Sequence, residues 1–171
     1  MGTNEDLAKI VQQEHELVFP AFDFHVAWDL GSSLRALAVS RKFPIAIDVR
    51  RFGGQHLFFT TLPGTAPTNA EWVRRKSNVV EMLHKSSYRV TLEQKQKRTS
   101  LAVKYALPPA DYAEAGGSFP ITVLGAGIIG SVTVSGLPQR MDHETVVETL
   151  CLHLGKDYSA LKLGEEPLLA P

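Results

Sequence analysis

Glycine pairs bracket two β-type runs in the last third of the chain, and this pattern constrains the fold more than any other feature. The runs are GGSFPITV, which begins at Gly116, and GIIGSVTVSGLP, which begins at Gly127. Glycine allows a positive φ or the close approach of a ligand. The pattern predicts a hairpin of strands 119–123 and 127–135, and it favours a binding cleft floored by that hairpin. The same glycines are equally typical of turns that bind nothing, so both interpretations stand at this point.

The rest of the chain predicts a second hairpin and several helices. Strands at 44–51 and 56–61 flank the turn FGGQ. Strands that come in adjacent pairs, rather than singly between helices, predict an α+β domain with an antiparallel sheet and helices packed on it. The other predicted elements are helices over 4–16, 23–40 (capped by Asp23), 69–85 (capped by Thr68) and part of 86–105, a short strand at 17–19, a helical turn at 110–115, and a last helix capped by Asp142 and ended by Gly155.

Length and charge restrict the class of protein. The 171 residues fit one domain, with a core over about 5–156 and a loose tail from Gly164 to Pro171. The 18 basic and 18 acidic residues cancel, which argues against nucleic-acid binding and tolerates self-association. The basic stretch 88–98 is interrupted by Glu93 and favours a solvated helix. Cys151 is the single cysteine, so the chain has no intrachain disulfide, and its position on an apolar face favours a core residue over a nucleophile.

Targeting and membrane signals are absent from the sequence pattern. The first residues lack the basic-then-apolar pattern of a signal peptide, and no apolar run approaches the ~18 residues of a membrane span. We therefore expect a cytoplasmic protein that makes no membrane contact.

Several separated blocks occur in an order that resembles the haem-degrading domain family, also called HbpS-like or GlcG-like. The resemblance runs from about Val39 to Leu154. It is closest to a branch of uncharacterised proteins, because of the motifs RKFPI at Arg41, FPI at Phe119 and GLPQ at Gly136. The blocks that carry it are Asp48 with Gly53-Gly54, Lys76, Gly116-Gly117-x-x-Pro120-Ile121, Gly130, Val134-Ser135-Gly136 and Asp142.

The resemblance implies a profilin-like fold, in which a five-stranded antiparallel sheet is sandwiched by helices. It also implies homo-oligomers, and haem binding that in some members is linked to oxidative breakdown of haem. The function expected from it is a haem- or small-anion-binding protein, with haem as the candidate cofactor and catalytic residues unknown. A different class, a non-enzymatic oligomeric scaffold or interaction protein, is the alternative.

Haem binding would need an axial ligand, and two histidines are candidates for it. His56 and His143 lie beside the glycine turns expected at a cleft. A histidine at such a position is more often a surface or capping residue than an iron ligand. No pair of histidines has a spacing that demands a metal.

Cations on the helix over 69–85 are the sharper functional hypothesis. Arg75, Lys76 and Asn78 could receive a ligand carboxylate near the backbone amides of Gly116 and Gly117. A solvated helix face, or a salt bridge to Asp48 or to a neighbouring subunit, explains the same residues without a ligand. The resemblance adds Pro120 and Gly136 to the candidate ligand-binding set.

Overall fold

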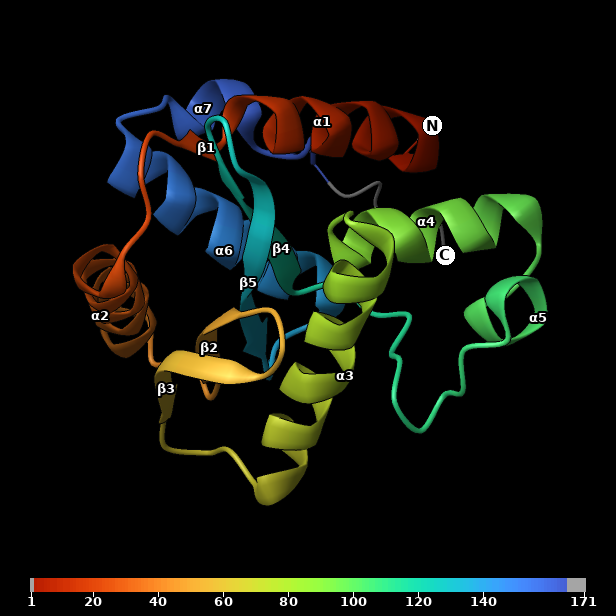
Figure 1. Ribbon diagram of the computed structural model, residues 1–171, viewed down its shortest axis with the longest axis horizontal. Helices are drawn as coiled ribbons and strands as arrows, with labels where there is room; N and C mark the ends of the chain where they lie inside the picture. The colour runs from red at the N-terminus through yellow and green to blue at the C-terminus, as the bar shows by residue number, and fades with distance from the viewer. Residues whose placement is uncertain (1, 166–171) are drawn as a thin grey trace.

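A five-stranded sheet forms the centre of the computed structural model, which describes residues 2–165 (Figure 1). The predicted loose tail from Gly164 therefore lies mostly outside the described residues. The sheet order is β1-β4-β5-β2-β3. The strands are β1 Val18–Phe19, β2 Ala46–Arg51, β3 Gln55–Thr61, β4 Ser118–Val123 and β5 Gly127–Ser135. Both predicted hairpins and the α+β class are confirmed.

One strand pair departs from the expected antiparallel sheet. β1 pairs with β4 in parallel, with Val18 opposite Thr122, while the other three pairs are antiparallel. The expectation of a wholly antiparallel sheet is therefore wrong at this edge. β1 has only two residues, because Pro20 has no backbone N–H to continue the ladder.

Apolar side chains cover one face of the sheet, where helices α2 (Phe24–Ser40) and α6 (Gln139–Leu154) pack (Figure 1). Burial of each large side chain there stabilises the fold by roughly 1.5–3 kcal/mol, so this layer is the main core. The strands present alternate residues to it, as a half-buried β pattern requires. Its fully buried members include Ile47, Val49, Phe119, Ile121, Val132, Val134, Leu30, Leu34, Val146 and Leu150.

The opposite face carries α3 (Pro67–Leu83) and α4 (Ser87–Lys97). Two small apolar clusters join the peripheral helices α1 (Gly2–Glu16) and α5 (Leu101–Tyr105) to α3 and α4. Ile10 of α1 packs with Tyr88 and Leu92, close to α7 (Tyr158–Leu161), and Leu101 of α5 packs with Val79 and Val90. The three helices of greatest length among those predicted, over 4–16, 23–40 and 69–85, all exist within two or three residues of the predicted ends.

Three local predictions are wrong. α3 begins at Pro67, a favoured first helical residue, and Asn69 accepts a hydrogen bond from the Ala66 N–H, so Thr68 is not the cap. α6 begins at Gln139 after Pro138, which places Asp142 inside its first turn. Residues 110–115 form a turn and an extended segment rather than a helical turn. None of the helices described over residues 2–165 is long and apolar enough to cross a membrane.

Gly136 is a position where the fold itself requires glycine. Its φ is +152°, and a Cβ there would lie 2.1 Å from the Pro44 carbonyl oxygen and 3.0 Å from Ile45 Cα. The backbone after β5 thus passes directly against the segment that enters β2. This close approach explains Gly136 without any ligand.

We expect Gly136→Ala to lower the free energy of unfolding by at least about 2 kcal/mol, because the methyl group meets backbone that cannot shift and φ is positive. Urea denaturation measures the change. Gly164→Ala is the matched control, since a Cβ at Gly164 meets nothing within 4 Å. Equal stability of the two variants would contradict the close-approach explanation.

Candidate functional site

Polar side chains line the face of the sheet that packs against α3 and α4. The segment SVTVS at 131–135 turns its valines to the main core and its hydroxyl groups to α3. Ser131 Oγ lies 3.1 Å from Ser77 Oγ of α3, and Thr133 Oγ1 lies 2.7 Å from Ser118 Oγ of β4. Each of these four side chains is buried. Hydrogen bonding therefore holds this layer together where the other face uses apolar contact.

At one end of the polar layer, Asp48 holds an arginine and a histidine side chain. Asp48 and Arg50 are alternate residues of β2 and so lie on the same face, while His56 comes across the hairpin from β3, where it pairs with Arg50. The Asp48 carboxylate is fully buried and accepts from Arg50 Nε, and its other oxygen lies 2.5 Å from His56 Nδ1. The His56 side chain is 50% exposed. The buried carboxylate thus fixes the ring while the ring remains accessible.

A cavity of about 700 Å³ opens beside this group. Its volume is within the usual range for small-molecule sites. Arginine and glutamate side chains are among its lining residues, and apolar atoms make up the larger share of its surface. Arg50, His56, Phe59, Arg74 and Asn78 are among the lining residues.

The guanidinium of Arg74 in this cavity already contacts two carboxylates of the protein. Arg74 Nε donates to Glu71 at 3.1 Å and its NH1 group donates to Asp111 at 3.0 Å. These partners raise the pKa of the Arg74 guanidinium, so it stays charged at any ordinary pH. The side chain is 37% exposed, which leaves it able to meet an anion from solvent.

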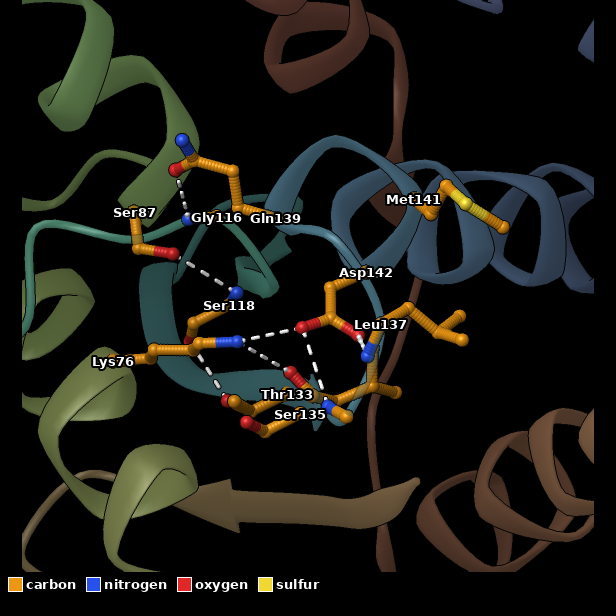
Figure 2. Close-up of polar contacts among 12 residues, drawn as sticks. Lys76, Ser87, Gly116, Ser118, Thr133, Ser135, Leu137, Gln139, Met141 and Asp142 are labelled. Carbon is orange, nitrogen blue, oxygen red and sulfur yellow. Dashed lines mark hydrogen bonds and ion pairs between the residues drawn. The ribbon is translucent and has the colours of Figure 1, made fainter. Parts of the chain in front are cut away.

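A second polar group centres on Lys76 and Asp142 (Figure 2). Lys76 Nζ donates to Asp142 Oδ2 at 2.8 Å and to the Val134 carbonyl at 3.2 Å. The carboxylate also accepts the backbone N–H of Leu137 at 3.0 Å and of Gly136 at 3.4 Å. Both ionic side chains are almost fully buried, at 3% and 1% exposure.

Burial and pairing act in opposite directions on these two groups. Burial lowers the pKa of Lys76 and raises the pKa of Asp142, and the contact between the two charges offsets each shift. The two backbone N–H groups favour the ionised carboxylate. The expected ligand carboxylate for Lys76 is thus supplied by the chain itself, and the expected alternative partner Asp48 is bound elsewhere.

The glycine pair at 116–117 lies beside the group formed by Lys76 and Asp142. The Gly116 N–H donates to Gln139 Oε1 at 3.1 Å (Figure 2). A Cβ on Gly117 would lie 2.4 Å from the Val134 carbonyl oxygen and 2.9 Å from Lys76 Nζ. Glycine at 117 therefore lets β4 begin directly against the buried lysine. A smaller cavity of about 290 Å³ adjoins, lined by Lys76, Asp142 and Gly136 among others.

The other predicted ligand-binding residues lie apart from one another. Arg75 donates to the Pro109 carbonyl at 2.9 Å and stacks on Trp72, and it lines neither of these two cavities. Asn78 donates to the Asp111 carbonyl at 2.8 Å and lines the large cavity with His56. Pro120 is buried in β4 opposite Ser131. The structure therefore disperses the predicted set. Lys76 and Gly136 line the small cavity, Asn78 and His56 line the large one, and the other predicted residues line neither.

His143 is fully buried in α6 and lines neither cavity. Its Nε2 lies 2.8 Å from Gln13 Oε1 of α1, and its ring packs between Tyr88 and Phe119. Burial, together with the nearby Arg140 charge, lowers the pKa of His143 to about 3. In this conformation the ring is a packing residue that no ligand can reach. Cys151 is also fully buried, and burial raises the pKa of its thiol to about 11.

Within residues 2–165, no group of three or more His, Cys, Asp or Glu side chains is arranged to hold a metal ion. Among the histidines of the described residues, His56 is the one that lines the large cavity.

Comparison with known protein families decides the family of this chain. Residues 22–151 match the family model described as haem degrading protein HbpS-like. The chain belongs to the HbpS-like family. A UPF0303 protein of Acidobacterium capsulatum is 56% identical over 165 residues, which cover 96% of this chain and 99% of that protein. The resemblance inferred from the sequence is confirmed.

Two solved structures share the fold. The crystal structure of Ybr137w is 25% identical, covers 90% of this chain and 92% of its own, and superposes with a TM-score of 0.83. The PduOC:heme complex is 16% identical, covers 78% of this chain and 94% of its own, and has a TM-score of 0.64. At 16% identity, the similarity to the PduOC:heme complex shows a shared fold and no more.

Three features of the polar layer were not predicted from the sequence. The alternation of Asp48 and Arg50 with Ile47 and Val49 was available as a sign that one face of β2 is charged. The regular alternation in SVTVS gave the same sign for β5. The pairing of Lys76 with Asp142 had no local signal, because the two residues are 66 positions apart.

We expect Lys76→Ala to lower the free energy of unfolding by about 3–5 kcal/mol, because it leaves the buried Asp142 carboxylate without its counter-charge. Chemical denaturation measures the loss. Arg41→Ala is the control, since it breaks the more exposed ion pair with Glu148 and should cost no more than about 1 kcal/mol. A Lys76→Ala protein of unchanged stability would favour the ligand-binding hypothesis for Lys76 instead.

The lowered pKa of the buried His143 predicts that the stability of the protein depends on pH. Below pH 6.5 the unfolded chain binds a proton on this ring, whereas the folded protein does not until about pH 3. The free energy of unfolding should therefore fall with decreasing pH in this window, by up to about 1.4 kcal/mol per pH unit. His143→Gln should remove that part of the slope in denaturation curves from pH 7 to 4. His25→Gln, at an exposed position, should leave the slope intact; equal slopes in all three proteins would refute this account.

Proposed function

We propose that this protein binds a small anionic ligand in the large cavity, and that the ligand is haem, held through His56. The observation that carries the proposal is the contact of His56 Nδ1 with the buried Asp48 carboxylate, at 2.5 Å. Metal-binding histidines are commonly oriented by such a carboxylate on the second ring nitrogen. Nε2 of a half-exposed ring that lines the cavity is then the nitrogen offered to a ligand.

The residues of the cavity fit haem in three respects. His56 supplies an axial ligand, and Arg50 and Arg74 supply cations for carboxylates. Phe59 and Ala70 supply an apolar part of the wall. When bound, haem would supply the iron chemistry toward oxygen, and the residues of this chain would bind and orient it. The family description and the haem complex of PduOC support the choice of haem among anionic ligands.

A second function, as a non-enzymatic oligomer that presents an interaction surface, is favoured by one observation. Large apolar side chains are exposed together on α2 and β3, including Trp28 at 62% and Phe59 at 46%. Exposed apolar patches of this kind commonly mark protein interfaces. We propose self-association of the chain on this ground, independently of ligand binding.

Haemin titration followed by visible spectroscopy tests the proposed ligand. We expect a stoichiometric Soret shift with the wild-type protein, which His56→Ala abolishes because iron loses its protein ligand. Metal-free protoporphyrin IX should still bind to His56→Ala, since Arg50 and Arg74 remain, and Arg74→Ala should weaken its binding at least tenfold.

Two controls keep this test specific. His25→Ala, on the exposed side of α2, and His143→Gln should both retain the haemin spectrum. A Soret shift that survives in His56→Ala would place the iron ligand elsewhere and overturn the proposed site. A wild-type protein that binds neither haemin nor protoporphyrin IX would overturn the proposed ligand.

A further inference from the structure

The exposed side of α2 carries a stripe of residues at helical spacing, Phe24, Trp28, Ser32, Arg35 and Val39, here called the α2 stripe. With 3.6 residues per turn, all five fall on one side of the helix. Phe24 is 56% exposed, Trp28 62% and Val39 49%. In Figure 1, α2 lies at the outer edge of the molecule, beside the edge strand β3 and with no other helix beyond it.

Two shallow cavities lie along this stripe and share Arg35. One of about 550 Å³ is lined by Trp28, Ser32 and Phe58, among others, and one of about 470 Å³ by Val39 and Lys42, among others. Together they form a groove between α2 and the β3 side of the sheet. Its walls are largely apolar side chains that the fold leaves uncovered.

β3 leaves the approach to this groove open. It is an edge strand whose sole ladder partner among the described residues is β2. Edge strands are usually guarded by charged side chains, proline or bulges. The β3 sequence QHLFFTT has no Lys, Arg, Asp, Glu or Pro, and its one irregularity, at Leu57, lies near the turn end. Apart from His56, β3 therefore has no ionisable side chain that would repel another copy of the same strand.

The chemistry of the α2 stripe is complementary to itself in the reverse direction. If a second α2 packs antiparallel about a two-fold axis near Ser32, Trp28 of one copy meets Arg35 of the other, and Phe24 meets Val39. The first contact pairs a guanidinium with an indole ring, and the second pairs two apolar side chains. Asp29 lies next to Trp28 and adds a negative charge for the same guanidinium. Within the described residues, neither Asp29 nor Arg35 makes an ion pair.

We propose that the α2 stripe is the interface at which a second copy of this chain docks, with the two α2 helices antiparallel about a two-fold axis near Ser32. The proposal rests on the self-association proposed above and names its surface. It does not depend on what the large cavity binds. The stripe and the groove would be buried in the assembly, which explains why so much apolar surface is exposed on a single copy.

Charge placement at the contact gives the first test, by sedimentation equilibrium. Trp28→Arg should weaken self-association at least tenfold, because it replaces the indole ring by a second guanidinium that repels Arg35 of the other copy. The double variant Trp28→Arg/Arg35→Glu should restore association, because each introduced guanidinium then meets an introduced carboxylate. Leu152→Arg, at a 75% exposed apolar residue of α6, should leave association unchanged.

Cross-linking tests the position of the axis. Ser32→Cys should form a disulfide-linked dimer under mild oxidation, because the two introduced thiols lie close together at the axis. Ser40→Cys should not, because Ser40 lies about 12 Å farther along the helix. The native Cys151 is buried and does not compete.

The outcomes separate the two proposals. A wild-type protein that stays monomeric up to millimolar concentration overturns both self-association and the interface. An oligomer that Trp28→Arg leaves intact, without a Ser32→Cys cross-link, overturns the α2 stripe while self-association stands. Failure of haemin to bind would leave either result unchanged, because no residue substituted in these tests lines the large cavity.

Discussion

The buried ion pair of Lys76 and Asp142 joins three segments on which the rest of the fold depends. Lys76 comes from the middle of α3, Asp142 from the first turn of α6, and the Val134 carbonyl from β5. Removing two charges from water costs several kcal/mol per ion, and the pair recovers this cost only with good geometry and further hydrogen bonds. The backbone N–H groups of Gly136 and Leu137 supply those bonds. The pair therefore fixes how the helices sit on the sheet more than it adds net stability.

The polar layer around this pair explains why the two faces of the sheet differ in function. The face under α2 and α6 is filled with apolar side chains, so its role is to form the main core. The face under α3 carries serine, threonine, aspartate and arginine side chains, each held by a specific partner, as with Ser77 and Ser131. At the large cavity between α3 and the β2–β3 hairpin, the same layer reaches solvent at His56. The charged cavity therefore lies where the polar layer meets solvent.

The sequence predicted those parts of the fold that depend on local patterns. Alternating apolar residues located β2, and the glycine-bracketed runs located β4 and β5. Asp23 was correctly identified as the cap of α2, where its side chain accepts from the Val26 N–H. The parallel pairing of β1 was not predictable, because two residues carry no periodicity. The burial of His143 was not predictable either, since it depends on α1 packing against α6 through Gln13, 130 residues away. Local sequence patterns specify the helices and strands, whereas contacts between residues distant in the sequence decide which side chains are buried.

The glycines show how the same residue type can make room for backbone or for a ligand. At Gly117 and Gly136 a Cβ would collide with carbonyl oxygens, so the space that glycine provides there is already filled by the protein. At Gly53 and Gly54, in the β2–β3 turn, a Cβ would meet nothing within 4 Å, and Gly54 lines the large cavity. The glycine-rich hairpin at the end of the chain therefore builds the frame. The open space, the half-exposed His56 and Arg50 lie at the other hairpin, and this is the physical reason to propose the ligand site there.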